Sequence, residues 1–118
     1  MKNYYALCSW RLENGKILER ILFKLKKDLP KELDYISKEL LTNDEFKFDI
    51  FPFIDSIFIN NAPSVKINLD ERNWKWVKRK YGTIPFSDIP LSKKYNDRIL
   101  EFDSDDDAKL WFEMEYNF

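Results

Sequence analysis

The acidic run at 103–107, Asp-Ser-Asp-Asp-Asp, has the spacing closest to that of a metal site. Its first, third and fifth residues stand where a calcium-binding EF-hand loop places carboxylates. That loop also needs Gly at position 6 and a bidentate Glu at position 12, and the chain has Ala108 and Met114 there. Ser104 with Asp107 instead satisfies a helix-capping pattern, and acidic residues favour the positive end of a helix. We therefore predict a helix start with no metal, and the candidate partner-binding residues of the run are Asp105, Asp106 and Asp107.

The segment 72–81, Arg-Asn-Trp-Lys-Trp-Val-Lys-Arg-Lys-Tyr, combines positive charge with aromatic rings. At about 100° per residue, Trp74, Val77 and Tyr81 share one face of a helix, and this face is predicted to enter the core. Trp76 falls on the opposite face. Its angular neighbours are the basic residues Arg72, Arg79 and Lys80.

Two interpretations of the Trp76 face stay open. In the first interpretation, another element, such as the residues at 82–97, covers the Trp76 ring, and the basic residues are merely solvated. Alternatively the face is a binding surface for an acidic protein partner, with Trp76 as its anchor, or for the phosphates and bases of a nucleic acid. The candidate contact residues are Arg72, Trp76, Arg79 and Lys80.

Catalytic chemistry has little support in the composition. The chain has no histidine, which excludes every mechanism that uses an imidazole base or ligand. Its two glycines, Gly15 and Gly82, are not spaced as in a phosphate-binding loop. No spacing indicates Tyr or Lys acid–base chemistry. We therefore predict that the protein is not an enzyme and binds no cofactor.

Charge is strongly segregated along a nearly neutral chain. The 20 basic and 21 acidic residues leave a net charge of −1. Residues 16–31 and 71–80 each carry a net +4, whereas residues 96–118 carry a net −6. Such polarity orients a partner or supports head-to-tail self-association, unless the acidic and basic parts pack beside each other within the chain.

The first part of the chain mixes strand and helix signals. Residues 3–12 are predicted to form a strand that buries the single cysteine, Cys8, and Asn14-Gly15 predicts a turn. For residues 16–28 we predict a helix, because their apolar residues recur at helical spacing and Glu19 interrupts the strand alternative. A second helix is predicted at 30–41, with Pro30 in its first turn.

Strands then alternate with helices to the end of the sequence. Strands are predicted at 46–50, 53–59, 64–68 and 98–102, with a turn at 60–63 and a long loop at 82–97. Asp70 is expected to cap a helix that runs to about Tyr81 and is closed by Gly82. The tail at 110–118 alternates like a strand but also fits a helix face, and we predict that it begins as a helix.

These elements predict an α+β fold in a single domain, residues 1–118. Its antiparallel sheet would have four or five strands, with two or three helices packed on one face, at 16–41, 70–81 and 105–115. No apolar run is long enough to span a bilayer, and one cysteine forms no internal disulfide. We therefore expect a cytoplasmic protein with no membrane partner.

The segment 98–112, Arg-Ile-Leu-Glu-Phe-Asp-Ser-Asp-Asp-Asp-Ala-Lys-Leu-Trp-Phe, resembles the ends of some small tailed-phage accessory proteins of unknown function. The resemblance covers about 20 residues of a total of 118, and it implies a phage or prophage origin and no activity. Residues with A- and T-rich codons, such as Lys, Asn, Ile and Phe, are also frequent.

The function expected from these features is that of a small binding protein, a phage-encoded factor that binds or inhibits a host protein. One alternative is a nucleic-acid-binding module that uses the basic aromatic helix at 70–81, with an affinity that falls as salt rises. The other alternative is a structural or assembly protein.

Overall fold

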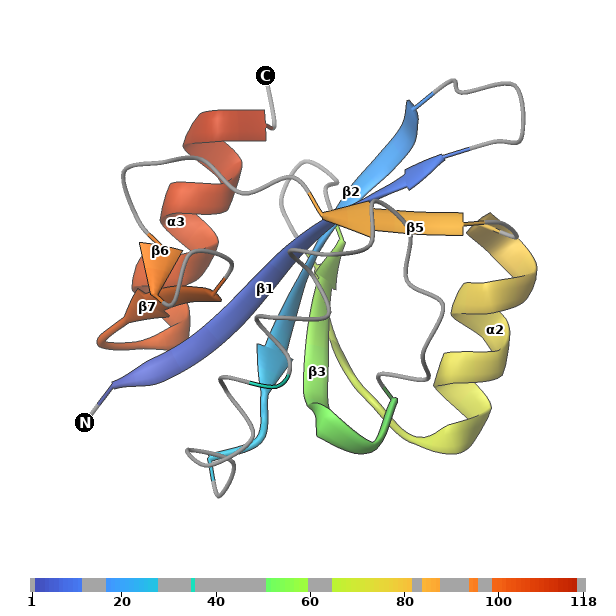
Figure 1. Ribbon diagram of the computed structural model, residues 1–118, viewed down its shortest axis with the longest axis horizontal. Helices are drawn as coiled ribbons and strands as arrows, with labels where there is room; N and C mark the ends of the chain where they lie inside the picture. Colours follow the sequence, from blue (N-terminus) through green and yellow to red (C-terminus); the bar gives the residue numbers. More distant parts are fainter. Residues whose placement is uncertain are drawn as a thin grey trace.

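An antiparallel sheet organises the computed structural model of the chain, with a helix on each side of it (Figure 1). The structure describes residues 2–11, 17–27, 35, 51–59, 65–81, 84–87, 94–95 and 99–116. Its strands are β1 (Asn3–Arg11), β2 (Ile17–Leu25), β3 (Ile54–Ile59), β4 (Val65–Asn68), β5 (Ile84–Ser87), β6 (Lys94–Tyr95) and β7 (Ile99–Phe102). The described helices are the 3₁₀ turn η1 (Phe51–Phe53) and the α-helices α2 (Glu71–Tyr81) and α3 (Asp105–Tyr116).

The strand order is β4-β3-β2-β1-β7-β6, and β5 also pairs with β1. The two short strands β5 and β6 therefore extend a five-stranded body. One edge of β1 pairs with β2 from Tyr5 to Arg11. Its other edge is divided, because β7 pairs with residues 3–5 and β5 pairs with residues 8–11. The first strand of the chain is thus joined to segments about 80 and 100 positions later.

The core has two layers because the central strands are buried on both faces. One layer contains Ala6, Cys8, Ile21, Phe23 and Ile57, and Val77 of α2 belongs to it. The other layer contains Tyr5, Leu7, Leu22 and Phe58, together with Ala108 and Phe112 of α3. Neighbouring residues of a strand point to opposite faces, so these sets place α2 and α3 on opposite sides of the sheet (Figure 1).

The predicted α+β class with an antiparallel sheet is confirmed. The placement of the helices on one face is wrong for α2 and α3, which cover one face each. The physical reason is that β1, β2 and β3 bury apolar side chains on both faces, and each face needs its own cover.

The helix predicted at 16–28 is also wrong, because residues 17–25 form the strand β2. This strand lies between β1 and β3, and its residues 21–25 are all buried. A strand buried on both faces loses the apolar–polar alternation that identifies an edge strand, and its apolar residues then match helical spacing as well.

Most of the remaining predicted elements that fall on described residues are confirmed. Strands at 3–12, 53–59, 64–68 and 98–102 are confirmed to within about two residues, and so are the helix at 70–81 and the helical start of the tail. The loop predicted at 82–97 is interrupted by β5 and β6. Several predicted features lie outside the described residues: the turns at Asn14-Gly15 and 60–63, the strand at 46–50, Gly82, and all of the helix at 30–41 except Tyr35.

Both predicted helix caps are present. The backbone N–H of Asn73 donates a 2.7 Å hydrogen bond to Oδ1 of Asp70, and that of Asp107 donates a 3.1 Å bond to Oγ of Ser104. Each bond satisfies an N–H group that has no partner within the first turn of the helix. Within the described ranges, neither helix has the length and apolar character needed to cross a membrane.

Candidate functional site

Helix α2 turns its aromatic residues to opposite sides. Val77 is fully buried, and Trp74 packs edge-on against Phe23, with 6.3 Å between the ring centroids. The predicted core face is therefore confirmed for these two residues, whereas the Tyr81 side chain is not among those described. Trp76 faces the other way and keeps 37% of its surface exposed.

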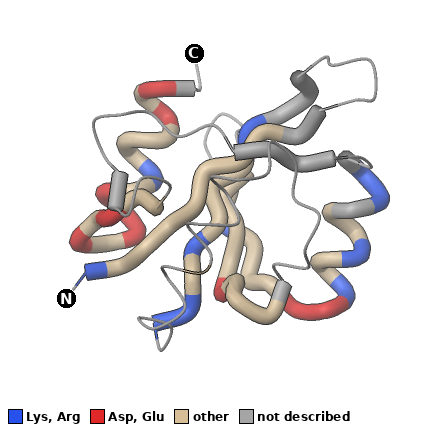
Figure 2. Tube along the Cα trace, viewed as in Figure 1, with Lys and Arg blue, Asp and Glu red and all other residues tan. Residues whose placement is uncertain are grey.

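The exposed side of α2 carries Arg72, Trp76, Arg79 and Lys80, which we call the α2 surface. Figure 2 shows its basic residues along the helix. The structure brings three of the four together, because Arg72, Trp76 and Arg79 line one pocket of about 410 Å³. Ile67 of β4 and Asn73 complete its lining. The amide of Asn73 donates a 2.7 Å hydrogen bond to the backbone oxygen of Asn68, which fixes α2 against the end of β4.

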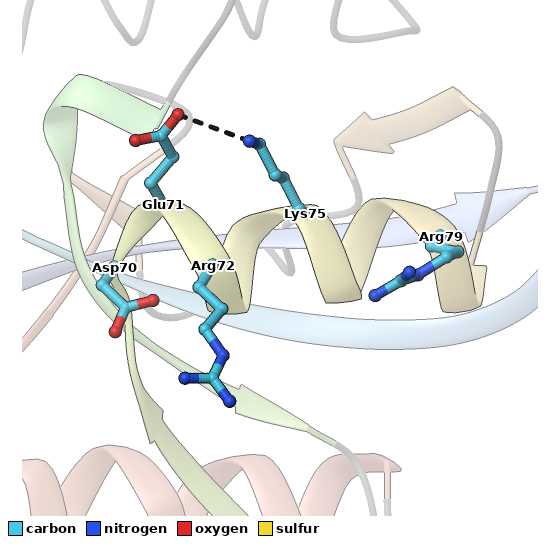
Figure 3. Close-up of a pocket in the computed structure, with 5 residues that line it drawn as sticks. All are labelled: Asp70, Glu71, Arg72, Lys75 and Arg79. Carbon is cyan, nitrogen blue, oxygen red and sulfur yellow. Dashed lines mark ion pairs between the residues drawn. The ribbon is translucent and has the colours of Figure 1, made fainter.

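A second pocket, of about 610 Å³, lies along the same helix (Figure 3). It shares Arg72 and Arg79 with the first pocket, and its other lining residues are Asp70, Glu71 and Lys75. Glu71 and Lys75 form an ion pair of 3.6 Å, and Arg72 points away from that pair (Figure 3). Among the described residues, no carboxylate pairs with Arg72 or Arg79, so these two guanidinium groups supply both pockets with positive charge that is not ion-paired there.

Lys80 modifies the aromatic part of the α2 surface. Its Nζ lies 5.0 Å from the centroid of the Trp76 ring, which is within the range of a cation–π interaction. One face of the indole is therefore covered by an ammonium group of the same helix. The interpretation that the residues at 82–97 cover the Trp76 ring stays a prediction, because most of them lie outside the described residues.

A charged cluster joins the start of α3 to the sheet, and we call it the Asp105 cluster: Asp105, Tyr5, Lys24 and Lys66. The Tyr5 hydroxyl donates a 2.6 Å hydrogen bond to Asp105. Nζ of Lys24 lies 3.0 Å from one carboxylate oxygen, and Nζ of Lys66 lies 2.5 Å from the other. Tyr5 and Lys24 are direct cross-strand partners on β1 and β2.

The cluster shifts the pKa values of Asp105 and Tyr5 in opposite directions. Partial burial tends to raise the pKa of Asp105, but the hydrogen bonds from Lys66, Tyr5 and Lys24 outweigh it and lower that pKa to about 2. Burial, and then the bond to Asp105, raises the pKa of the Tyr5 hydroxyl far above its usual value. At neutral pH the carboxylate is therefore charged and the hydroxyl is protonated, which suits an attachment point between helix and sheet.

The three acidic candidates of the run at 103–107 thus have different environments. The Asp105 carboxylate is engaged by residues of the same chain, whereas Asp106 and Asp107 are exposed. The neighbouring Asp103 pairs with Lys2 at 2.7 Å, which lowers the pKa of the Asp103 carboxyl group. In the described part of the chain, no three His, Cys, Asp or Glu side chains are arranged to hold a metal ion.

Sequence reasoning missed Tyr5, Lys24 and Lys66 as members of this cluster. The usable signal is Lys24, a lysine between the apolar residues Phe23 and Leu25, and the structure leaves only 11% of its side chain exposed. Such a buried ammonium group requires an acidic partner, but the partner is 81 positions away and no local pattern identifies it.

The outward side of α3 is a second surface that the sequence did not reveal. Leu110 and Met114, one turn apart, are 57% and 70% exposed. Trp111, which follows Leu110 in the sequence, packs on Phe102 with 5.6 Å between the ring centroids. These residues line a pocket of about 340 Å³ whose acidic members are Glu101, Asp103 and Asp107. We call Leu110, Trp111 and Met114, with this acidic rim, the α3 surface.

Comparisons of the chain with models of protein families, with curated proteins and with solved structures found no match. The chemistry of the α2 surface and the α3 surface is therefore the basis for the function proposed below.

Proposed function

We propose that this chain is a small non-enzymatic binding protein whose α2 surface binds an acidic surface of a protein partner. The supporting observation is that Arg72, Trp76 and Arg79 line a single pocket, with Ile67 as an apolar wall. Trp and Arg are the residue types that most often dominate the energetics of protein interfaces. A site that combines both in one concavity offers an anchor and a charge-specific contact.

The charge of the α2 surface selects the kind of partner. Arg72 and Arg79 stand seven positions apart and reach the same pocket, so each can form a forked pair with a carboxylate. The segment 71–80 has a net charge of +4, which speeds the encounter with an acidic partner. The partner surface that fits has carboxylates around an apolar side chain. The phage origin that the sequence resemblance implies makes a host protein one candidate for this partner.

A nucleic acid fits the α2 surface less well. Single-stranded nucleic acids bind by stacking successive bases on exposed rings within a basic groove. Here Lys80 covers one face of Trp76, and the exposed fraction of that ring is 37%. The opposite face of the sheet carries the acidic helix α3, so the basic surface of α2 does not continue onto that helix (Figure 2).

Affinity capture from a nuclease-treated bacterial lysate, followed by identification and purification of the captured protein, tests the proposal. Its dissociation constant is then measured by calorimetry for the native chain and for the variants Trp76→Ala and Arg72→Glu/Arg79→Glu. We expect each variant to weaken binding at least about tenfold. The matched control is Lys26→Glu/Lys27→Glu, which changes the net charge equally at two exposed positions outside α2 and should leave the affinity unchanged.

Two results would overturn the proposal. One is a partner whose affinity is the same for the native chain and both α2 variants. The other is tight binding of a single-stranded oligonucleotide at low salt, with an affinity that falls steeply as salt rises and is lost in the Arg72→Glu/Arg79→Glu variant. That result would assign the α2 surface to nucleic acid.

A further inference from the structure

The α3 surface has the properties that the α2 surface requires of a partner. It presents apolar side chains with carboxylates beside them, in one pocket of about 340 Å³. We infer that the α2 surface of one copy docks on the α3 surface of a second copy, so that the chain associates head to tail. This inference rests on the proposed function, because it names a partner for the same site.

The apolar part of the α3 surface is unusual for a helix that borders solvent. Ala108 and Phe112 supply the buried side of α3, and both are fully buried. Leu110 and Met114 lie off that side, and more than half of each residue is exposed. Adjacent exposed apolar residues with a polar rim mark interaction sites more often than isolated ones do. Trp76 of a second copy supplies an apolar side chain that would cover them.

The charges of the two surfaces are opposite. Glu101, Asp103 and Asp107 contribute three carboxylates to the α3 surface. Lys2 pairs with two of them, Asp103 at 2.7 Å and Glu101 at 3.8 Å, whereas no lysine or arginine of the described residues pairs with the Asp107 side chain. The guanidinium groups of Arg72 and Arg79 likewise have no acidic partner among the described residues. Association would bring Arg72 and Arg79 close to Asp107, and none of these three side chains has an ion-pair partner among the described residues.

The arrangement of the helices sets the symmetry of the contact. Because α2 and α3 cover opposite faces of the sheet, one copy cannot dock its α2 surface and its α3 surface on the same second copy at once (Figure 1). The contact is therefore heterologous: each added copy buries one α2 surface and one α3 surface and exposes another of each. Heterologous contacts build rings or open chains, so species larger than dimers are expected.

Sedimentation velocity of the native chain over a range of concentrations, at low and at high salt, provides the first measurement. We expect the average mass to rise above that of a dimer with concentration and to fall as salt screens the facing charges. The Lys26→Glu/Lys27→Glu control should behave like the native chain.

Two capping variants provide the decisive measurement. Arg72→Glu/Arg79→Glu disables the α2 surface and keeps the α3 surface, whereas Leu110→Ser/Met114→Ser does the reverse. All four positions are exposed, so both variants are expected to fold, which circular dichroism checks. Each variant alone should be monomeric. An equimolar mixture should form a one-to-one dimer and nothing larger, because only one pair of intact surfaces remains in each pair of chains.

Three results would overturn the inference: a native chain that stays monomeric at all concentrations, a capping variant that still associates alone, or a mixture that forms no dimer. A native chain that is monomeric but captures an acidic protein through Arg72 and Arg79 would overturn only this inference and leave the proposed function intact. A native chain that neither associates with itself nor binds an acidic protein through the α2 surface would overturn this inference and the proposed function together.

Discussion

The hydroxyl of Tyr5 donates a hydrogen bond of 2.6 Å to Asp105, although 100 positions separate the two residues. The Tyr5 ring is fully buried and packs edge-on against Phe102, with 5.6 Å between the centroids. Lys24 and Lys66 reach the same carboxylate from β2 and β4. One side chain at the start of α3 is therefore bonded to three strands, and this explains how a short helix is held in one position on the sheet.

Replacing Asp105 by alanine should destabilise the protein by about 2–4 kcal/mol, because it leaves the Lys24 ammonium group, only 11% exposed, without this carboxylate. The buried Tyr5 hydroxyl would lose its bond as well. Urea unfolding followed by circular dichroism gives the change in free energy. The control is Asp106→Asn in the same helical turn, an exposed position where a change within about 0.5 kcal/mol is expected. Equal effects of the two substitutions would contradict the role assigned to Asp105.

Acid should weaken the fold through the same carboxylate. The pKa of Asp105 is about 2 in the folded chain, against an ordinary value of 3.8, so as the pH falls the unfolded chain binds the proton first. The stabilisation is complete above about pH 5 and is lost as the pH falls to about 2, with an amplitude of about 2 kcal/mol. Urea titrations across this range measure it. In Asp105→Asn this component should disappear, and an unchanged pH profile in that variant would contradict the prediction.

The two tryptophans of α2 should respond differently to truncation. Trp74→Ala removes a ring that packs on the core against Phe23 and should cost about 2–4 kcal/mol. Trp76→Ala removes a more exposed ring and should cost about 1 kcal/mol or less, while weakening partner binding. Thermal unfolding of the two variants separates these effects. A loss of several kcal/mol in Trp76→Ala would assign that ring to the core instead.

Cys8 should report unfolding directly. It is the only cysteine of the chain and is fully buried in β1 between β2 and β5. A thiol reagent such as a maleimide therefore reacts only when the strand opens, and labelling should be slow in the native protein and fast in urea. Mass spectrometry of samples quenched over time follows the reaction. Labelling at equal rates in both conditions would contradict the burial of this strand.

The sequence predicted those elements whose signals are local. The α2 cap at Asp70 and the α3 cap at Ser104 depend on residues three positions apart, and both are present. The short strands β4 and β7 also lie where the pattern placed them. Each of these features is determined by neighbouring residues, so a reading along the chain is sufficient.

Features that depend on distant residues were predicted poorly. Strand β2 was predicted to be a helix because its burial on both faces follows from pairing with β1 and β3, which no local pattern shows. The assignment of both helices to one face failed for the same reason, since the two-layer core becomes visible only when β1, β2 and β3 are side by side. At the candidate site, the outward position of Trp76 followed from helical periodicity, whereas the pocket that joins it to Ile67 needs the packing of α2 on β4.

The divided edge of β1 has a consequence for the order of events during synthesis. Residues 3–11 leave the ribosome before their partner strands and can pair with β2 soon after it emerges, but their other edge pairs with residues 84–87 and 99–102. Until those residues emerge, a nascent chain exposes an unpaired, largely apolar strand edge, which is the kind of surface that chaperones bind and that aggregates readily. Conditions that delay the emergence of residues 84–102 should therefore lower the soluble yield.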